Sequence, residues 1–499
     1  MIRTLGLVFL LTFVVGGQGS GPTPRYSTKT GYETSFEPQS DEFVRRERYW
    51  QAIAQDVGEL SAVDQCQPAG VYVVHRHGTR YMSDGDIEDY NSILTRMKTE
   101  GVNDNFAYLL DIPDNLYPIS MEGELHPAGF AEMRGLGERI RARVPELFSG
   151  NDLGNFTFQG TYRQRTIDSA FGYIEGLLEA GAMCNVTGKT PSKDTVTCRN
   201  MTTGDVEVVV IDHIEEGRED RVLKFYENCG KFIVTVDEND TAVIENTKFG
   251  RGSEMAAVLQ SVATKLAPTG SSTPFNMTID ELEVLNHMCG YETAYNGSSL
   301  WCNLFTDDEK RVIEYYLDLD QYWTEGYGHE INYEMACPLV DDVASYLSGV
   351  LNTGTPKGAF KFAHSSTLQP FLTILGLYKD SPKLMADNYN VSINRTWASG
   401  RISPMGGHLA FHFFRCPNND HRVLVQHNEL PIQVGACQDF FCPYDTVVTH
   451  LTESSNGCMW DNICSVPPVD PGDGGASALA NSLLLMLILV ASALLAVSC

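Results

Sequence analysis

Three apolar stretches of this chain are followed closely by arginine or histidine, and this pattern constrains the fold more than any other feature. The stretches and the basic residues behind them are residues 71–74 with Arg76, His77 and Arg80, residues 156–158 with Arg165, and residues 360–363 with His364. Their β-branched and aromatic side chains favour strands. Ligands of open α/β sheets bind beyond the carboxyl ends of the strands. The pattern therefore predicts an α/β sheet that gathers cationic side chains at one edge.

Helical segments alternate with the predicted strands, as an α/β fold requires. We predict helices over residues 41–57, 167–180 and 367–377. Two further strands are predicted over residues 206–213 and 423–425. The alternation indicates a central sheet flanked by helices.

A long middle section interrupts this alternation. Residues 215–350 are mixed in charge and mainly helical by pattern, most clearly at residues 280–285 and 307–319. We therefore expect an α/β core over residues 21–214 and 351–465, with a mainly helical insertion at residues 215–350.

The chain is strongly acidic, because 64 aspartates and glutamates outnumber 36 lysines and arginines. A formal charge of −28 argues against a protein that follows a nucleic-acid backbone, which calls for a basic surface. An anionic ligand has to be held by a local cluster of Arg or Lys, against the overall field.

Both ends of the chain predict export. Residues 1–20 combine an early Arg3, an apolar run and small residues, which is the order of a signal peptide. Residues 466–499 form a Pro/Gly-rich stalk and an apolar tail, with no charge after Asp473. A transmembrane helix normally keeps Lys or Arg on its cytoplasmic side, so the tail favours a glycosylphosphatidylinositol (GPI) anchor signal. We expect a protein anchored on the extracellular face of the plasma membrane.

Cysteines and glycosylation motifs agree with export. Of 13 cysteines, Cys499 lies in the tail, and the other 12 form an even set that predicts disulfides. Cys184 with Cys198, and Cys437 with Cys442, are close enough in sequence to pair, while the remaining connectivity is open. Eight Asn-x-Ser/Thr motifs predict several glycosylated surface loops. They begin at Asn155, Asn185, Asn200, Asn239, Asn276, Asn296, Asn390 and Asn394.

The basic residues behind the predicted strands suit a phosphate ligand. Several guanidinium groups can clamp phosphate oxygens through paired hydrogen bonds. A neutral histidine among them can attack phosphorus and form a phosphohistidine, while the cations stabilise the charge of the transferring group. Each residue alone is more often structural, so the prediction depends on their meeting in space.

The segment Arg76-His77-Gly78-Thr79-Arg80 after a hydrophobic strand resembles the RHGxR signature of the histidine acid phosphatases. Other similar segments are Arg165 with Asp168-Ser169-Ala170, His364, residues 401–409 and residues 428–431. The similarity runs from about residue 66 to about residue 440. In detail it is closest to the multiple inositol polyphosphate phosphatase branch.

This resemblance implies a phosphoglycerate-mutase-like α/β fold, with a central mixed sheet flanked by helices. It implies an enzyme that removes phosphates from inositol hexakisphosphate and related polyphosphates, can act on 2,3-bisphosphoglycerate, and needs no metal or other cofactor. His77 would be the nucleophile and His364 a second catalytic group. The phosphate would be held by Arg76, Arg80, Arg165 and His364. The expected partners are a small phosphorylated substrate and, through the lipid anchor, the membrane, while the oligomeric state stays open.

The sequence departs from the family at the general acid. After the second histidine the family has Asp or, in the inositol polyphosphate branch, Ala-Glu, whereas this chain has Ser365 and Ser366. A serine hydroxyl is too weakly acidic to protonate an alkoxide near the working pH. One hypothesis is that Asp84 or Asp86, the acids nearest to the signature in sequence, takes over this role.

Two functions therefore stay open. The first is a phosphomonoesterase acting on inositol polyphosphates, and the second is a weakly active or inactive pseudophosphatase that binds a phosphorylated ligand at the cell surface. The complete nucleophile and clamp favour the enzyme, and the missing acid favours the pseudophosphatase. Leaving groups that need no proton could still be cleaved without the acid.

Two histidine pairs have spacings that occur in metal sites. His408 and His412 would share the face of a helix, but Leu409 follows where a zinc protease needs glutamate. His75 and His77 would share one face of a strand, with no evident third ligand. We predict no metal site.

Overall fold

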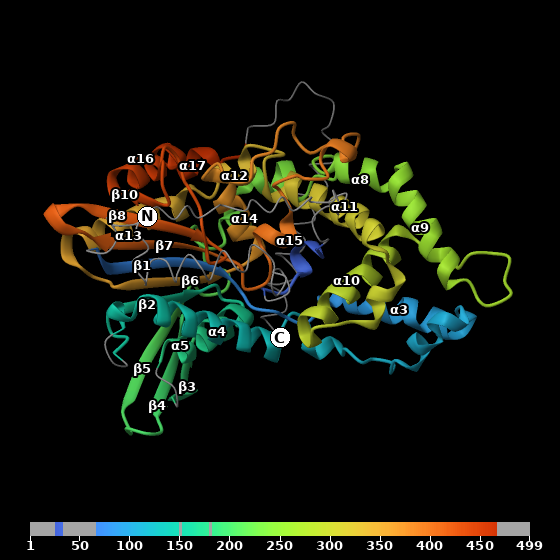
Figure 1. The fold of residues 1–499 in the computed structure, drawn as a ribbon, viewed down its shortest axis with the longest axis horizontal. Coiled ribbons are helices and arrows are strands. Elements are labelled where there is room, and N and C mark those ends of the chain that lie inside the picture. The colour runs from blue at the N-terminus through green and yellow to red at the C-terminus, as the bar shows by residue number, and fades with distance from the viewer. Residues whose placement is uncertain (1–24, 33–65, 149–151, 179–181, 467–499) are drawn as a thin grey trace, which may run out of the picture.

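A computed structural model describes residues 25–32, 66–148, 152–178 and 182–466 (Figure 1). The predicted signal peptide, the predicted helix at residues 41–57 and all but the first residue of the predicted stalk and anchor signal lie outside these residues. Within the described ranges, no helix combines the length and apolar character needed to cross a bilayer.

The core of the fold is one sheet of ten strands. Their bounds are β1 (Gln67–Arg76), β2 (Phe156–Gly160), β3 (Ala182–Thr190), β4 (Lys193–Asn200), β5 (Val206–His213), β6 (Gly358–Ala363), β7 (His408–Arg415), β8 (His421–His427), β9 (Leu430–Pro431) and β10 (Phe441–Pro443). The order across the sheet is β10-β8-β7-β1-β6-β2-β5-β4-β3, and β9 pairs with β8. The neighbours β1, β6, β2 and β5 run parallel, so their carboxyl ends share one edge, and the remaining pairings are antiparallel. The predicted mixed α/β sheet is confirmed.

Helices cover both faces of the sheet, and further helices pack beyond its edge (Figure 1). Those named below are α3 (Asp84–Glu100), α4 (Pro127–Arg143), α5 (Gln164–Leu177), α6 (Phe225–Asn228), α7 (Gly230–Phe232), α8 (Ile244–Gly250), α9 (Ser253–Leu266), α10 (Ile279–Asn296), α11 (Asp307–Glu325), α12 (Ile331–Glu334), α13 (Cys337–Thr353), α14 (Ser365–Ile374), α15 (Ser399–Ile402), α16 (Tyr444–Ser455) and α17 (Trp460–Ile463). Figure 1 places α4 and α5 on one side of the sheet, and α13 and α16 on the other.

Strand β1 is buried on both faces, because its alternating side chains enter two different cores. Val71 and Val73 pack in the cluster under α4 and α5, together with Phe360. Tyr72 and Val74 pack in the larger cluster, which continues through α13 and α14 into the helical part. A strand covered on both sides reads as one continuous apolar run, which is why the sequence signal at residues 71–74 is strong.

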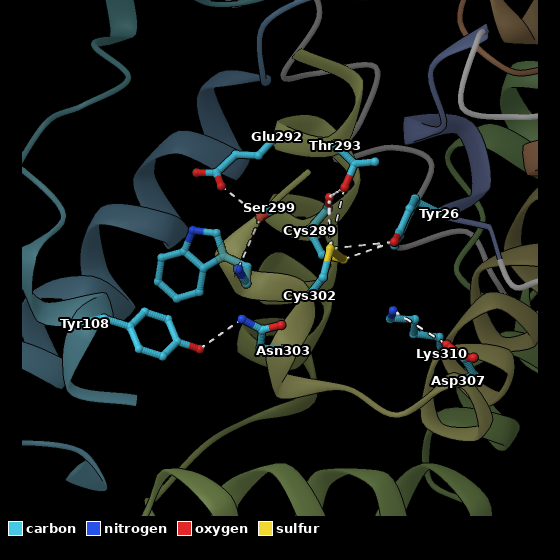
Figure 2. Close-up of a disulfide and its surroundings, with 11 residues drawn as sticks. Tyr26, Tyr108, Cys289, Glu292, Thr293, Ser299, Cys302, Asn303, Asp307 and Lys310 are labelled. Carbon is cyan, nitrogen blue, oxygen red and sulfur yellow. Dashed lines mark hydrogen bonds and ion pairs between the residues drawn. A yellow bond between two sulfur atoms is a disulfide. The ribbon is translucent and has the colours of Figure 1, made fainter. Parts of the chain in front are cut away.

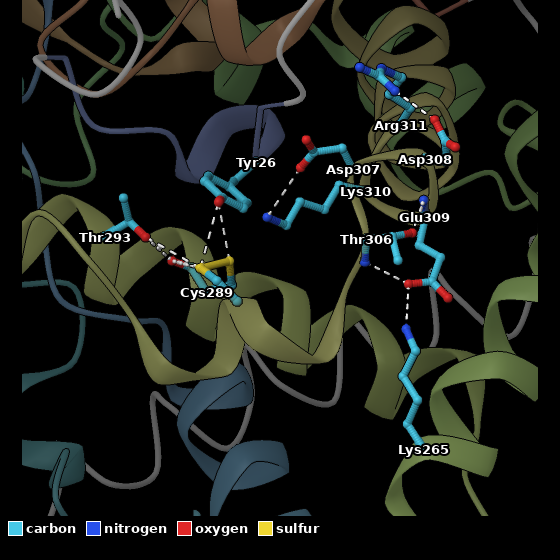
Figure 3. A network of polar contacts seen from close by, with 11 residues as sticks. Tyr26, Lys265, Cys289, Thr293, Thr306, Asp307, Asp308, Glu309, Lys310 and Arg311 are labelled. Carbon is cyan, nitrogen blue, oxygen red and sulfur yellow. Dashed lines mark hydrogen bonds and ion pairs between the residues drawn. A yellow bond between two sulfur atoms is a disulfide. The ribbon is translucent and has the colours of Figure 1, made fainter. Parts of the chain in front are cut away.

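In the described structure, all the elements between β5 and β6 are helices, from α6 to α13. The predicted helical stretches at residues 280–285 and 307–319 are confirmed, and both helices extend further as α10 and α11. Helix α11 starts with a capping box, in which Thr306 Oγ1 accepts the Glu309 N–H and Glu309 Oε2 accepts the Thr306 N–H (Figure 3). Lys265 of α9 also pairs with Glu309, at 2.6 Å.

Three sequence-based assignments need correction. Helix α5 begins at Gln164, before the predicted residue 167, because its first turn is polar and carries no apolar periodicity. His408 and His412 lie on strand β7 and not on a helix. Residues four positions apart lie on one face both in a helix and in a strand, so this spacing alone cannot distinguish a helix from a strand. The hairpin of β3 and β4 was not predicted, since its strands are half exposed and carry mixed polar residues.

All 12 cysteines outside the tail form disulfides. The pairs are Cys66–Cys416, Cys184–Cys198, Cys229–Cys464, Cys289–Cys302, Cys337–Cys458 and Cys437–Cys442. The two predicted local pairs are confirmed. Two of the long-range pairs join the section between β5 and β6 to the chain around α16 and α17.

Six of the eight glycosylation motifs have an exposed asparagine, as expected of surface loops. Asn239 is half-buried, whereas Asn200 is buried. Asn200 Oδ1 accepts the backbone N–H groups of Thr202 and Thr203 at 2.8 and 3.0 Å. Asn200 is therefore not at the surface, and its side chain closes a turn.

Candidate active site

A cavity of about 240 Å³ opens at the carboxyl edge of the parallel strands. Its lining includes all of the predicted site residues, namely Arg76, His77, Arg80, Arg165 and His364. The other lining residues are Thr28, Lys29, Arg163, Lys224, Tyr226, Glu227, Gln321, Glu325, Ser365 and Ser366. The structure thus brings together predicted site residues that are up to 288 positions apart in sequence, Arg76 and His364.

The register of the sheet brings the two histidines together. Arg76, the last residue of β1, lies opposite Ala363, the last residue of β6. The His77 N–H donates to the Ala363 carbonyl at 2.9 Å, which extends the pairing by one residue. His77 and His364 therefore follow the ends of neighbouring parallel strands, and their ring centroids are 5.5 Å apart.

His77 is held as a neutral imidazole whose second ring nitrogen has a free lone pair. Its Nδ1 lies 2.9 Å from the Gly78 carbonyl oxygen, so Nδ1 carries the proton and Nε2 keeps a lone pair. Burial, together with the positive charges of Arg165 and Arg76, holds the pKa of His77 well below its usual value. The neutral ring, which is the form that can act as a nucleophile, is therefore favoured over the protonated ring.

The loop after His77 is fixed by close packing against α4. A Cβ on Gly78 would lie 2.5 Å from the Gly129 carbonyl oxygen, so a larger residue cannot fit there. The Gly78 N–H donates to Ser169 Oγ at 3.0 Å. Glu132 accepts both the N–H and the hydroxyl of Thr79, each at 2.9 Å. The signature segment is thus immobilised from both α4 and α5.

His364 is also oriented by its hydrogen bonds. It stands at the N-cap of α14, and its Nε2 lies 3.0 Å from Thr161 Oγ1. Arg165, in the first turn of α5, places its Nη2 3.4 Å from His364 Nδ1. Burial and the charges of Arg165 and Lys224 hold the pKa of His364 well below its usual value. His364 is therefore a neutral hydrogen-bonding group in the wall of the cavity.

The arginines remain charged within this cationic site. Burial and the charge of Arg80 lower the pKa of Arg76 to about 9 and that of Arg165 to about 10, so both stay protonated at neutral pH. Arg76 is anchored by the Ser403 carbonyl at 2.7 Å, and Arg80 by the Tyr81 carbonyl at 2.6 Å. Six cations line the cavity against two carboxyl groups. This is the local positive cluster that an anionic ligand of so acidic a chain requires.

Lys29 reaches the cavity from the N-terminal segment of residues 25–32, which the sequence did not place at the site. Tyr26 anchors this segment, because its hydroxyl oxygen lies 3.1 Å from Cys289 Sγ and 3.6 Å from Cys302 Sγ of one disulfide (Figure 2). Ser27 Oγ lies 2.6 Å from Ser399 Oγ of α15. No periodicity or motif marks such a docking contact in the sequence.

Two further cations, Arg163 and Lys224, were also missed. Both lie over the ring of Tyr162, with the Lys224 Nζ 4.0 Å and the Arg163 Cζ 4.9 Å from its centroid. Lys224 forms an ion pair with Glu227. Arg163 could have been suspected from its position two residues before Arg165, but Lys224 lies in the middle section that showed only helical patterning.

The hypothesis that Asp84 or Asp86 supplies the missing acid is wrong. Neither residue lines the cavity. Asp84 is exposed in the first turn of α3. Asp86 lies 3.0 Å from His287 Nδ1 and 3.6 Å from Lys29 Nζ. Burial opposes the ionisation of Asp86, but Lys29 and His287 outweigh it and bring its pKa below the usual value, the wrong direction for a proton donor.

His75 and His77 face different surroundings. His75 stacks on Phe362 at 5.2 Å between ring centroids, inside the sheet, while His77 faces the cavity. Among the residues that the structure describes, no group of three or more His, Cys, Asp or Glu side chains is arranged to hold a metal ion.

A comparison with known protein families shows to which family this chain belongs. The model of the histidine phosphatase superfamily (branch 2) matches residues 69–428, from β1 to the end of β8. This chain belongs to that superfamily. The match begins at the third residue of β1, the strand that leads into His77, and includes every predicted site residue.

Relatives within the superfamily include multiple inositol polyphosphate phosphatase 1 of Gallus gallus, which is 28% identical over 420 residues, covering 81% of this chain and 86% of the relative. The Homo sapiens protein of the same name is also 28% identical, covering 80% and 82%. Among solved structures, the phytase from D. castellii superposes with a TM-score of 0.63 at 18% identity, covering 81% and 83% of the two chains. The Bifidobacterium longum multiple inositol polyphosphate phosphatase complexed with inositol hexasulfate gives 0.60 at 17%, covering 83% and 93%. These superpositions establish the shared histidine phosphatase fold.

Proposed function

We propose that this histidine phosphatase is a phosphomonoesterase that removes phosphates from inositol polyphosphates through a phosphohistidine at His77. The observation that carries the proposal is the neutral His77, whose Nε2 is left free by the Nδ1–Gly78 contact in a cavity lined by six cations. A free imidazole nitrogen supplies the nucleophile. Arginine clamps hold the phosphate and stabilise the charge that develops during transfer.

The substrate class rests on similarity and on charge. Two relatives at 28% identity, each matched over more than 80% of its length, are named multiple inositol polyphosphate phosphatases. Several of the cavity cations lie outside the RHGxR segment, which suits a ligand that carries more than one phosphate. Inositol hexakisphosphate is the first substrate to test, and 2,3-bisphosphoglycerate the second.

The proposal also places the protein on the cell surface. Its support is the signal peptide and GPI-anchor signal predicted from the two ends of the chain, together with six disulfides, which persist in oxidising compartments. One preparation can therefore test both location and activity. Full-length protein is expressed in animal cells, and a phosphatidylinositol-specific phospholipase is used to release it from the surface.

Released protein is expected to liberate phosphate from inositol hexakisphosphate, and His77→Ala is expected to lose this activity entirely. Wild-type protein quenched during turnover should carry acid-labile, alkali-stable phosphate, which the variant lacks. His421→Ala, on β8, is the matched histidine control and should remain active. A folded wild-type protein that binds inositol hexakisphosphate without releasing phosphate would instead establish the pseudophosphatase. Retention on the cells after lipase treatment would contradict the anchor.

A further inference from the structure

The cavity has a nucleophile and a phosphate clamp, but the residues after His364 do not supply an acid. Cleavage of an inositol phosphate releases an alkoxide, which needs a proton as the P–O bond breaks. Ser365 and Ser366 cannot give one at working pH, because a hydroxyl is far too weakly acidic. The donor has to be another group that faces the cavity.

Only two carboxyl groups occur among the described residues that line the cavity, Glu227 and Glu325. Glu227 forms an ion pair with Lys224. Glu325 is the last residue of α11, and no lysine, arginine or histidine of the described chain lies within ion-pair distance of it. Glu325 is therefore the carboxyl group that is free to carry a proton.

The carboxyl group of Glu325 is fixed beside the turn that bears His364. Ser366 Oγ donates to Glu325 Oε1 at 2.5 Å, and Gln369 Nε2 donates to Glu325 Oε2 at 2.6 Å. Both partners lie on α14, whose N-cap is His364. A glutamate from the middle section of the chain thus takes up the place next to Ser366, the position at which the resemblance led us to expect an acid.

The surroundings of Glu325 favour its protonated form. Burial raises the pKa of Glu325 to about 7, although the Ser366 hydrogen bond and the charge of Arg76 act in the opposite direction. Asp320 and Asp237 raise it further. The carboxyl end of α11 contributes in the same sense, since a helix C-terminus disfavours a negative charge.

The uncharged side chains near Glu325 are Gln321 of its own helix, Gln369 of α14 and Tyr226 of α6. The charged groups that share the cavity are its six cations, of which Arg76 acts most directly against the protonation of Glu325, and the second carboxyl group, Glu227. Gln369 links the two helices, because its Nε2 also donates to Gln321 Oε1 at 2.9 Å. A phosphate in the cavity adds negative charge and therefore raises the pKa of Glu325 again.

We propose that Glu325 is the proton donor of the reaction, a role that rests on the proposed phosphatase function. In the first step His77 Nε2 bonds to phosphorus, the P–O ester bond breaks, and the Glu325 carboxyl proton passes to the leaving oxygen. In the second step water attacks the phosphohistidine, its proton passes to the Glu325 carboxylate, and phosphate leaves His77. Ser366 and Gln369 are positioning residues that hold the carboxyl group against the cavity.

The experiment compares two leaving groups. Glu325→Gln keeps the shape of the side chain and removes the acid, so turnover of inositol hexakisphosphate is expected to fall by roughly 10²–10⁴-fold. Turnover of p-nitrophenyl phosphate, whose leaving group needs no proton, should change by less than about tenfold. In the wild type, turnover of inositol hexakisphosphate is expected to decline above a pH of about 7, as Glu325 loses its proton. This limb should be absent in Glu325→Gln.

Exchange of the two side chains provides the rescue. Glu325→Ser combined with Ser366→Glu moves the carboxyl group onto α14 and is expected to restore turnover of inositol hexakisphosphate at least tenfold over Glu325→Gln. Asp84→Asn, which removes an acid outside the cavity, should behave as wild type.

The two proposals fail in different ways. A wild-type protein inactive on both substrates overturns the phosphatase function and this role with it. A wild type active on both, with Glu325→Gln equally reduced on both or unaffected on both, overturns only the role of Glu325. Activity of Glu325→Gln on p-nitrophenyl phosphate shows that the variant is folded, and if it does not fold, the exchange variant decides the question.

Discussion

Single residues from distant parts of the chain complete a site whose centre is built from strand ends. Arg76, His77 and His364 follow directly from β1 and β6, whereas Lys29 depends on an N-terminal segment that is docked through Tyr26. Lys29 lies 3.6 Å from Asp86 and borders the cavity. It is therefore placed to meet a phosphate other than the one that is being transferred.

Lys29→Met is expected to raise the KM for inositol hexakisphosphate roughly 10- to 100-fold, since a hydrogen bond to a charged group contributes about 1.5–3 kcal/mol. The KM for p-nitrophenyl phosphate, which carries a single phosphate, should stay unchanged. Steady-state kinetics on both substrates measure the difference. Lys98→Met, which breaks a surface pair with Asp114, serves as the matched control. An equal rise for both substrates would place Lys29 in the central clamp instead.

At the scale of elements, the strands that carry the site could be predicted because each is buried and apolar, and each is followed by a basic residue of the site. The same reasoning could not reach Glu325. The apolar pattern at residues 307–319 identified α11, but nothing local indicates that its last turn ends in the cavity, beside α14. The contact joins Glu325 and Ser366, which are 41 positions apart, and such a tertiary contact leaves no periodic signal in the sequence. Proximity in sequence points instead to Asp84 and Asp86, which the fold places outside the cavity.

Helices α4 and α5 support the site through a close approach at small residues. A Cβ on Gly176 of α5 would lie 2.0 Å from the Arg134 carbonyl oxygen of α4, and a Cβ on Gly137 would lie 2.3 Å from the Tyr173 carbonyl oxygen. These are backbone contacts, which cannot be relieved by turning a side chain. The first turn of α5 carries Arg165, and the loop that α4 contacts carries Gly78. The spacing of these helices therefore bears on the position of the phosphate clamp.

Gly176→Ala is expected to lower the free energy of unfolding by about 1–3 kcal/mol, the usual cost of forcing extra volume into a packed interior. Gly135→Ala is the control on α4, where the nearest atom to a new Cβ is the mobile end of Arg139 at 3.2 Å. It should be neutral or stabilising by up to about 1 kcal/mol, because alanine favours a helix interior. Denaturant unfolding of the two variants and the wild type measures both values. Equal stability of the two variants would show that α4 and α5 can move apart freely.

At the scale of the whole molecule, a net charge of −28 surrounds a cavity lined by six cations. The fold also buries several histidines in neutral form. Burial, followed by the charge of His408, holds the pKa of His75 well below its usual value, and neither ring nitrogen of His75 has a hydrogen-bond partner among the described residues. Burial likewise lowers the pKa of His408 to about 4 and that of His427 to about 3.

These histidines make global stability depend on pH in a defined direction. In the unfolded chain a histidine takes up a proton below a pH of about 6.5, which the buried ring does not. Each such residue therefore contributes its full stability above pH 6.5 and loses it progressively as the pH falls toward the lowered pKa of the folded state. At pH 5 the loss is about 2 kcal/mol for one residue. We expect the melting temperature of the wild type to fall between pH 7 and pH 5.

His75→Phe isolates the contribution of one histidine to this loss of stability at low pH. Phenylalanine fits among Phe362, Tyr173 and His408, and it cannot be protonated. The variant should therefore lose about 2 kcal/mol less than the wild type between pH 7 and pH 5. Its stability at pH 8, where both forms of the residue are neutral, reports only the change in packing and provides the internal control. Parallel pH curves for variant and wild type would mean that His75 does not resist protonation in the folded state, and that the acid lability of the molecule arises elsewhere.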